Sequence, residues 1–98
     1  MNNTTKKMNE LPPYKVGEKY FIRTVTHHFT GKLTAVYDKE LVLSHCAWIA
    51  DDGRFSDTLK SGEHSEVEPY PEGAQVIIGR MSIIDAHIYQ PDLPLTQK

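Results

Sequence analysis

The chain has 98 residues, of which 39% are hydrophobic and 24% are charged, and both fractions are close to those of average globular domains. This length suits one small domain with a thin core, so burial against a partner subunit would add to its stability. The formal net charge of −2 excludes a general attraction to nucleic acid, so any anion-binding face must be local.

The single cysteine and the N-terminal sequence indicate the cellular compartment, and the charge is unevenly distributed along the chain. Cys46 cannot form a disulfide within the chain, which indicates a reducing, cytoplasmic environment. Residues 1–13 lack the apolar run of a secretory signal, and we expect no segment long and apolar enough to span a bilayer. Residues 1–45 carry a net charge of +3 and residues 46–98 a net charge of −5.

The chain divides into three parts. Residues 1–13 are polar and end in Pro12-Pro13, which predicts a flexible arm or an arm that becomes ordered on a partner. One domain is expected over residues 14–90. The last residues, 91–98, contain two prolines and predict an irregular tail.

Three strands are predicted in the first half of the domain. Residues 20–25 are rich in β-forming side chains, residues 29–38 follow after a tight bend, and residues 40–50 form a long apolar strand. Gly31 inside the second strand predicts a strong bend or a close approach of two backbones. Asp38-Lys39 has the chemistry of a turn.

An acidic insertion is predicted over residues 51–73. Asp51 or Asp52 could cap a short helix over residues 54–60, and Gly62 suits its end. The rest of the insertion is predicted to be an acidic loop. It could offer a contact surface for a partner protein, or it could keep anions away from one face.

The β pattern resumes after the insertion. Two further strands are predicted over residues 75–78 and 83–89, with Gly79 allowing a sharp turn between them. In the second of these, Ile84, Ala86 and Ile88 are expected to share one face. The predicted fold class is therefore all-β with a minor α part: a small, strongly bent, five-stranded barrel of the SH3-like or OB type, with the helical insertion between strands three and four.

Two segments resemble the motifs of a known family. The sequence FTGKLTAVYDKELVLS joins an apolar strand containing glycine to an Asp-containing turn and a strongly apolar strand. It resembles the first motif of the Sm-like (LSm/Hfq-type) small β-barrels. The sequence VIIGRMSIIDAHIY resembles the second motif, which has two apolar strands around a turn with glycine and a basic residue. The resemblance covers residues 16–89 except the insertion, and it is greater to Sm-like proteins of bacteriophages and mobile elements than to Hfq.

The resemblance implies an assembly and a ligand. Sm-like proteins form rings of about five to seven subunits, in which the fourth strand of one subunit pairs with the fifth strand of the next. On this chain the implied subunit interface is Val76, Ile77, Ile78, Ile84, Ala86 and Ile88. The two turns would meet at the pore and hold single-stranded, uridine-rich RNA by base stacking and phosphate contacts. The implied RNA-binding residues are Tyr37, Asp38, Lys39, Gly79, Arg80 and Met81.

A second hypothesis is a ring of phage origin that has a structural or interaction role without binding nucleic acid. Three features of the sequence favour it: the negative net charge, the acidic insertion, and the lack of the asparagine that typical Sm proteins carry shortly after the turn aspartate. In addition, Glu40 next to the first turn would repel phosphate.

We predict neither a metal site, a cofactor nor a catalytic site. The five histidines, His27, His28, His45, His64 and His87, match no zinc-ligand spacing. Ser44 lacks the surroundings of a catalytic nucleophile, and Cys46 beside Ala47 and Trp48 predicts a thiol in the core. The chain is therefore expected to be a binding protein and not an enzyme.

Overall fold

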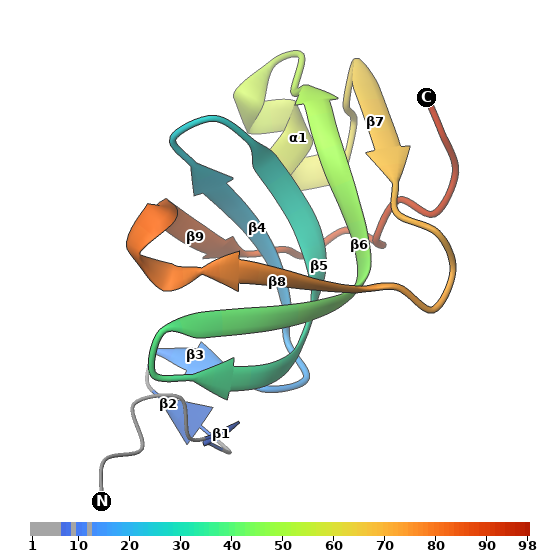
Figure 1. Ribbon diagram of the computed structural model, residues 1–98. Helices are drawn as coiled ribbons and strands as arrows, with labels where there is room; N and C mark the ends of the chain where they lie inside the picture. The colour runs from blue at the N-terminus through green and yellow to red at the C-terminus, as the bar shows by residue number, and fades with distance from the viewer. Residues whose placement is uncertain (1–6, 9, 12) are drawn as a thin grey trace, which may run out of the picture.

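The computed structural model describes residues 7–8, 10–11 and 13–98, and it shows a bent antiparallel sheet with one short helix (Figure 1). The strands of the main sheet follow in the order β7 (Glu66–Pro69), β6 (Glu40–Asp51), β5 (His28–Tyr37), β4 (Lys19–Thr24) and β9 (Ile83–Ile88). The predicted all-β class with a minor helical part is confirmed.

Two of the remaining strands attach to this order, and two others form a ladder of their own. Strand β8 (Gln75–Gly79) pairs with the first half of β6, and β1 (Lys7–Met8) pairs with the end of β5. Strands β2 (Glu10–Leu11) and β3 (Tyr14–Lys15) form a separate two-stranded ladder. The five predicted strands correspond to β4, β5, β6, β8 and β9. Most of the predicted arm, residues 1–6, 9 and 12, lies outside the described residues.

The sheet bends sharply at Gly31 and His45. The pairing of β5 with β6 shifts register between Thr30 and Lys32, and His45 opposite takes a positive φ of 50°, which gives the extra residue of a β-bulge. A Cβ added to Gly31 would lie 3.1 Å from the Cβ of Leu43. The predicted close approach at Gly31 is therefore confirmed. Because of the bend, the same edge of β6 pairs with β8 in the residues before His45 and with β7 in the residues after it.

Two hydrophobic cores lie on opposite faces of the sheet, since neighbouring residues of β4 belong to different cores. The inner core is Tyr20, Ile22, Phe29, Leu33, Val36, Leu41, Leu43, Cys46 and Ile78. The outer core is Phe21, Ala47, Ile49, Val67 and Tyr89, with Leu59 and Leu93 packed against it. Burial raises the pKa of the Cys46 thiol to about 12, and the predicted core thiol is confirmed.

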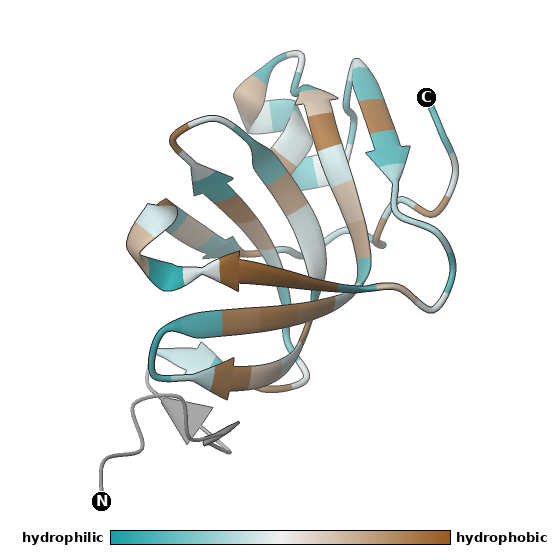
Figure 2. Cartoon of the chain, viewed as in Figure 1, coloured by the Kyte–Doolittle hydropathy of each residue, from teal (hydrophilic) through white to brown (hydrophobic). Residues whose placement is uncertain are grey.

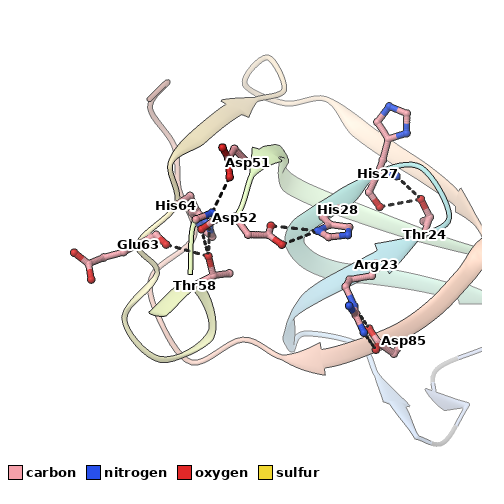
Figure 3. A network of polar contacts seen from close by, with 11 residues as sticks. Arg23, Thr24, His27, His28, Asp51, Asp52, Thr58, Glu63, His64 and Asp85 are labelled. Carbon is pink, nitrogen blue, oxygen red and sulfur yellow. Dashed lines mark hydrogen bonds and ion pairs between the residues drawn. The ribbon is translucent and has the colours of Figure 1, made fainter. Parts of the chain in front are cut away.

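The insertion covers the outer core with helix α1 (Phe55–Ser61), close to the predicted range. Gly62 ends the helix in the left-handed conformation, as predicted. The predicted aspartate cap is wrong, because Arg54 occupies the N-cap without a side-chain hydrogen bond. The carboxylate of Asp52 instead contacts Nδ1 of His28 at 3.0 Å (Figure 3).

The prediction of a plain acidic loop after the helix is also wrong, because part of it forms strand β7. Val67 is the one apolar side chain between Glu66 and Glu68, and it is buried in the outer core. The last residue of the irregular tail pairs with the other edge of β7, since the backbone N–H and C=O of Lys98 both bond to Val67 at 2.9 Å. In the described part of the chain, no helix has both the length and the apolar character needed to cross a membrane.

A buried chain of polar side chains joins helix α1 to Tyr89, the residue after β9, and Figure 3 labels its first members, Asp52, Thr58 and His64. The hydroxyl of Thr58 lies 2.6 Å from the carbonyl oxygen of Asp52 and 3.3 Å from Nδ1 of His64. Nε2 of His64 lies 3.0 Å from the hydroxyl of Tyr89. One arrangement of hydrogens gives both ring nitrogens of His64 a partner. The Tyr89 hydroxyl donates to Nε2 of His64, the Nδ1–H of His64 donates to the Thr58 hydroxyl, and that hydroxyl donates to the carbonyl oxygen of Asp52. This arrangement requires His64 to be neutral.

The neutral state of His64 makes stability depend on pH. Burial holds the pKa of His64 below its ordinary value of 6.5, so the unfolded chain binds the proton more readily than the folded one. The stabilisation is complete above about pH 6.5 and is lost as the pH falls through the lowered pKa. Between pH 7 and pH 5, the free energy of unfolding measured with urea should fall less for His64→Gln than for the wild type. The exposed His87→Gln is the control, and equal losses in all three proteins would contradict this role of His64.

Candidate functional site

The two turns that the sequence singles out lie against each other. Strand β5 ends at Tyr37 and β6 begins at Glu40, and Glu40 is the pairing partner of Gly79 at the end of β8. The backbone N–H of Arg80 donates to the carbonyl oxygen of Lys39 at 2.9 Å. The predicted site residues of both turns are therefore neighbours within one chain.

The guanidinium of Arg80 holds the first turn. Its Nη1 donates to the carbonyl oxygens of Tyr37 at 3.1 Å and Asp38 at 3.2 Å. It also lies 5.4 Å from the ring centroid of Tyr14, within the range of a cation–π contact. Arg80 is half-buried, so it stabilises the contact between the turns and keeps only part of its donor fork free.

The role predicted for Gly79 is wrong. Its φ of −68° and ψ of 126° are ordinary extended values, and a Cβ added there would meet nothing within 4 Å. The chain changes direction in the following 3₁₀ helix η1 (Arg80–Ser82), where the hydroxyl of Ser82 donates to the carbonyl oxygen of Gly79 at 2.7 Å. No conformation available only to glycine is needed at this position.

A groove of about 730 Å³ opens beside the two turns. Its lining residues are Tyr14, Asp38, Lys39, Arg80, Met81, Ile83, Ile84 and Asp85. Met81 is 96% exposed, and a long apolar side chain so fully in water is available to a ligand or a second subunit. Three lining residues, Tyr14, Ile83 and Asp85, were not predicted at the site. Tyr14 precedes the first predicted strand, and only the fold brings it to Arg80.

Charges at the groove are mixed. Lys39 and Arg80 are the basic lining residues, and Asp38 and Asp85 are the acidic ones. Arg23 on β4 forms a two-pronged ion pair with Asp85 (Figure 3). The hydrogen bond from Arg23 lowers the pKa of Asp85, which keeps the carboxylate ionised. The single chain therefore presents no strongly positive face here.

Strands β8 and β9 each have one partner among the described strands. Strand β8 pairs with β6, and β9 pairs with β4 (Figure 1). Their other edges are available, and Figure 2 shows β8 as one of the most hydrophobic ribbons. Exposed backbone edges with apolar side chains are the usual template for pairing with another chain.

The side chains expected at the subunit interface fall into two groups. Val76, Ile78 and Ala86 lie in or against the chain's own inner core. The other three are exposed: Ile77 by 69%, Ile84 by 61% and Ile88 by 45%. Ile84, Ala86 and Ile88 were expected to share one face of β9, and this prediction is wrong for Ile84. The pairing of β9 with β4 shifts register between Ile83 and Asp85, which breaks the alternation of side chains there. In the pairing, Thr24 lies opposite Ile83 and Ile22 opposite Ala86, so Ile84 is part of the bulge.

The histidines and Cys46 do not converge. His64 is buried in the polar chain described above, while His45 and His87 are exposed. Within the described part of the chain, no three His, Cys, Asp or Glu side chains are grouped so that they could hold a metal ion.

Comparisons with protein-family models, with curated proteins and with solved structures found no match to this chain.

Proposed function

We propose that the chain forms an Sm-like homo-oligomeric ring that binds single-stranded, uridine-rich RNA at the groove beside the two turns. The observation that carries the proposal is the contact between these turns, where the N–H of Arg80 bonds to Lys39. The turns of the two segments that resemble Sm motifs meet at this one place.

Ring formation is supported by the free edges of β8 and β9. Each edge presents unpaired backbone groups together with exposed isoleucines, Ile77 on β8 and Ile84 and Ile88 on β9. Pairing β8 of one copy with β9 of the next would bury the isoleucines and the backbone groups of both edges. The contact is heterologous, so it generates a closed ring when the rotation between copies closes.

The groove offers two kinds of contact to RNA. Met81 and the ring of Tyr14 supply apolar and aromatic surface for a base, worth about 1–3 kcal/mol for each stacked base. Lys39 supplies a charge for phosphate, and the free part of the Arg80 fork adds to it. One such site is weak, but a ring repeats it, and several lysines around one pore concentrate positive potential.

The second candidate function is a ring with a structural or interaction role and no nucleic-acid binding. Two observations favour it. Arg80 already donates to two carbonyl oxygens of its own chain, and Asp38 and Asp85 balance the two basic residues of the groove. The two candidates share the ring and differ in what the groove binds.

Fluorescence anisotropy with a labelled uridine oligomer at low salt separates the candidates. We expect micromolar binding that weakens with salt, and a loss of about tenfold or more in Lys39→Ala because the lysine is repeated around the ring. Lys60→Ala, which removes an exposed lysine from α1, is the matched control. Absence of binding by an intact ring at micromolar protein would reject RNA binding and leave the structural role.

A further inference from the structure

An aromatic surface lies on the second half of β6, beyond the bend and away from the two turns. We define it as His27, Phe29, Trp48 and Tyr70. The ring of His27 is stacked on Phe29 with centroids 6.0 Å apart and lies 5.7 Å from the ring of Trp48. The ring of Phe29 lies 6.5 Å from that of Tyr70. The four rings come from β5, from β6 and from the residues just before β5 and just after β7, and they are joined in one cluster.

The sheet holds this aromatic surface in place. Phe29 and Trp48 are pairing partners on β5 and β6, and the N–H of Tyr70 donates to the carbonyl oxygen of Cys46 at 2.9 Å. Phe29 is buried, whereas Trp48 and Tyr70 are each 39% exposed. Two large rings are therefore presented to solvent on a rigid base, with little conformational entropy left to lose on binding.

Tyr70 also lines a pocket of about 330 Å³. Pro71, Leu95 and Glu72 line it, together with His45 at the bulge. Its volume is enough for one long side chain of a ligand. Tyr70 belongs to both the aromatic surface and this pocket, so the two are adjacent.

The charges around the site are acidic. Glu68 lies directly opposite Trp48 in the pairing of β6 with β7, and Glu72 lines the pocket. Gln97 donates to one carboxylate oxygen of Glu68 at 2.7 Å, which fixes the position of that carboxylate and leaves its other oxygen for a ligand. The described residues of the site include no lysine or arginine. A phosphate-bearing ligand would meet only repulsion from these carboxylates.

We propose that this site binds an arginine side chain of a protein partner. A guanidinium is planar, so it can stack on a partly exposed ring such as Trp48 or Tyr70, and its fork of donors matches a carboxylate such as Glu68. Lysine would gain the charge attraction but not the flat stacking or the paired hydrogen bonds. The inference is independent of the proposed RNA site, because it uses none of the residues that line that groove.

Trp48 is the only tryptophan of the chain, so its fluorescence reports directly on the site. The full chain is titrated with a short glycine-arginine peptide, with the same peptide carrying lysine or glutamate in place of arginine, and with a uridine oligomer. We expect a saturable change in Trp48 emission with the arginine peptide, about three- to tenfold weaker binding of the lysine peptide, and no change with the glutamate peptide.

Variants that keep Trp48 identify the contacts. Tyr70→Ala and Glu68→Gln should each weaken the binding of the arginine peptide about three- to tenfold. Glu63→Gln, which removes an exposed carboxylate after helix α1, should leave binding unchanged. Equal responses to the arginine and glutamate peptides would overturn the proposal. A saturable Trp48 response to the uridine oligomer would overturn it as well, because the aromatic surface would then be a base-stacking platform.

Discussion

Gly31→Ala is expected to lower the free energy of unfolding by about 1–3 kcal/mol, the usual cost of adding volume to a packed core. The new Cβ would lie 3.1 Å from both Cβ and Cδ1 of Leu43 and 3.4 Å from the carbonyl oxygen of Ser44. Leu43 is fully buried in the inner core, so neither it nor the backbone of β6 can withdraw freely. The bend that directs β6 toward both β8 and β7 would be strained.

Gly79→Ala is the matched control, because it adds the same methyl group where nothing lies within 4 Å and where φ is −68°. We expect its unfolding free energy to stay within about 0.5 kcal/mol of the wild type. Urea denaturation followed by far-UV circular dichroism measures both variants. A Gly31→Ala protein as stable as Gly79→Ala would show that β5 and β6 separate at the bend without cost.

Thr58→Val is expected to lower the free energy of unfolding by about 2–3 kcal/mol, because it leaves buried groups without a partner. The valine has nearly the same shape, but it cannot donate to the carbonyl oxygen of Asp52 or accept from His64. Thr58 and His64 are both buried, so water cannot take over these bonds. The loss would loosen helix α1 from the outer core.

Ser56→Ala, on the exposed side of the same helix, removes a hydroxyl without burying an unpaired group and should change stability by less than about 0.5 kcal/mol. Thermal unfolding and hydrogen exchange of the helix amides distinguish the two variants. If Thr58→Val were as stable as Ser56→Ala, the buried polar chain would contribute nothing to the stability of the insertion.

The strands that carry many β-forming residues could be predicted from the sequence. Residues 20–25 and 40–50 have strong apolar patterns, and Gly31 marked the bend correctly because a glycine inside a strand usually indicates a bulge or a close approach of two backbones. The two turns of the candidate site could also be located in the sequence, since each lies between two clearly apolar strands. The pairing of β6 with β8 then brings these turns together.

Other features could not be predicted because they depend on the tertiary structure. Strand β7 has a single buried side chain, Val67, between two glutamates, so it leaves no alternating pattern to detect. The outer core joins Phe21 to Tyr89, two residues that are far apart in the chain. The position of Arg80 over Tyr14 likewise required the fold, and it gives that arginine a structural contact between the turns beside the phosphate contact proposed for it.

Assembly through the free edges of β8 and β9 is central to the proposed function, and the molar mass in solution by light scattering tests it most directly. The proposed ring predicts a mass several times the 11.2 kDa of one chain. Ile77→Lys places a charge on the exposed edge of β8 without entering the core and is predicted to reduce that mass to one chain. A wild-type protein that stays at 11.2 kDa at high concentration would contradict the ring and, with it, the repeated site for RNA.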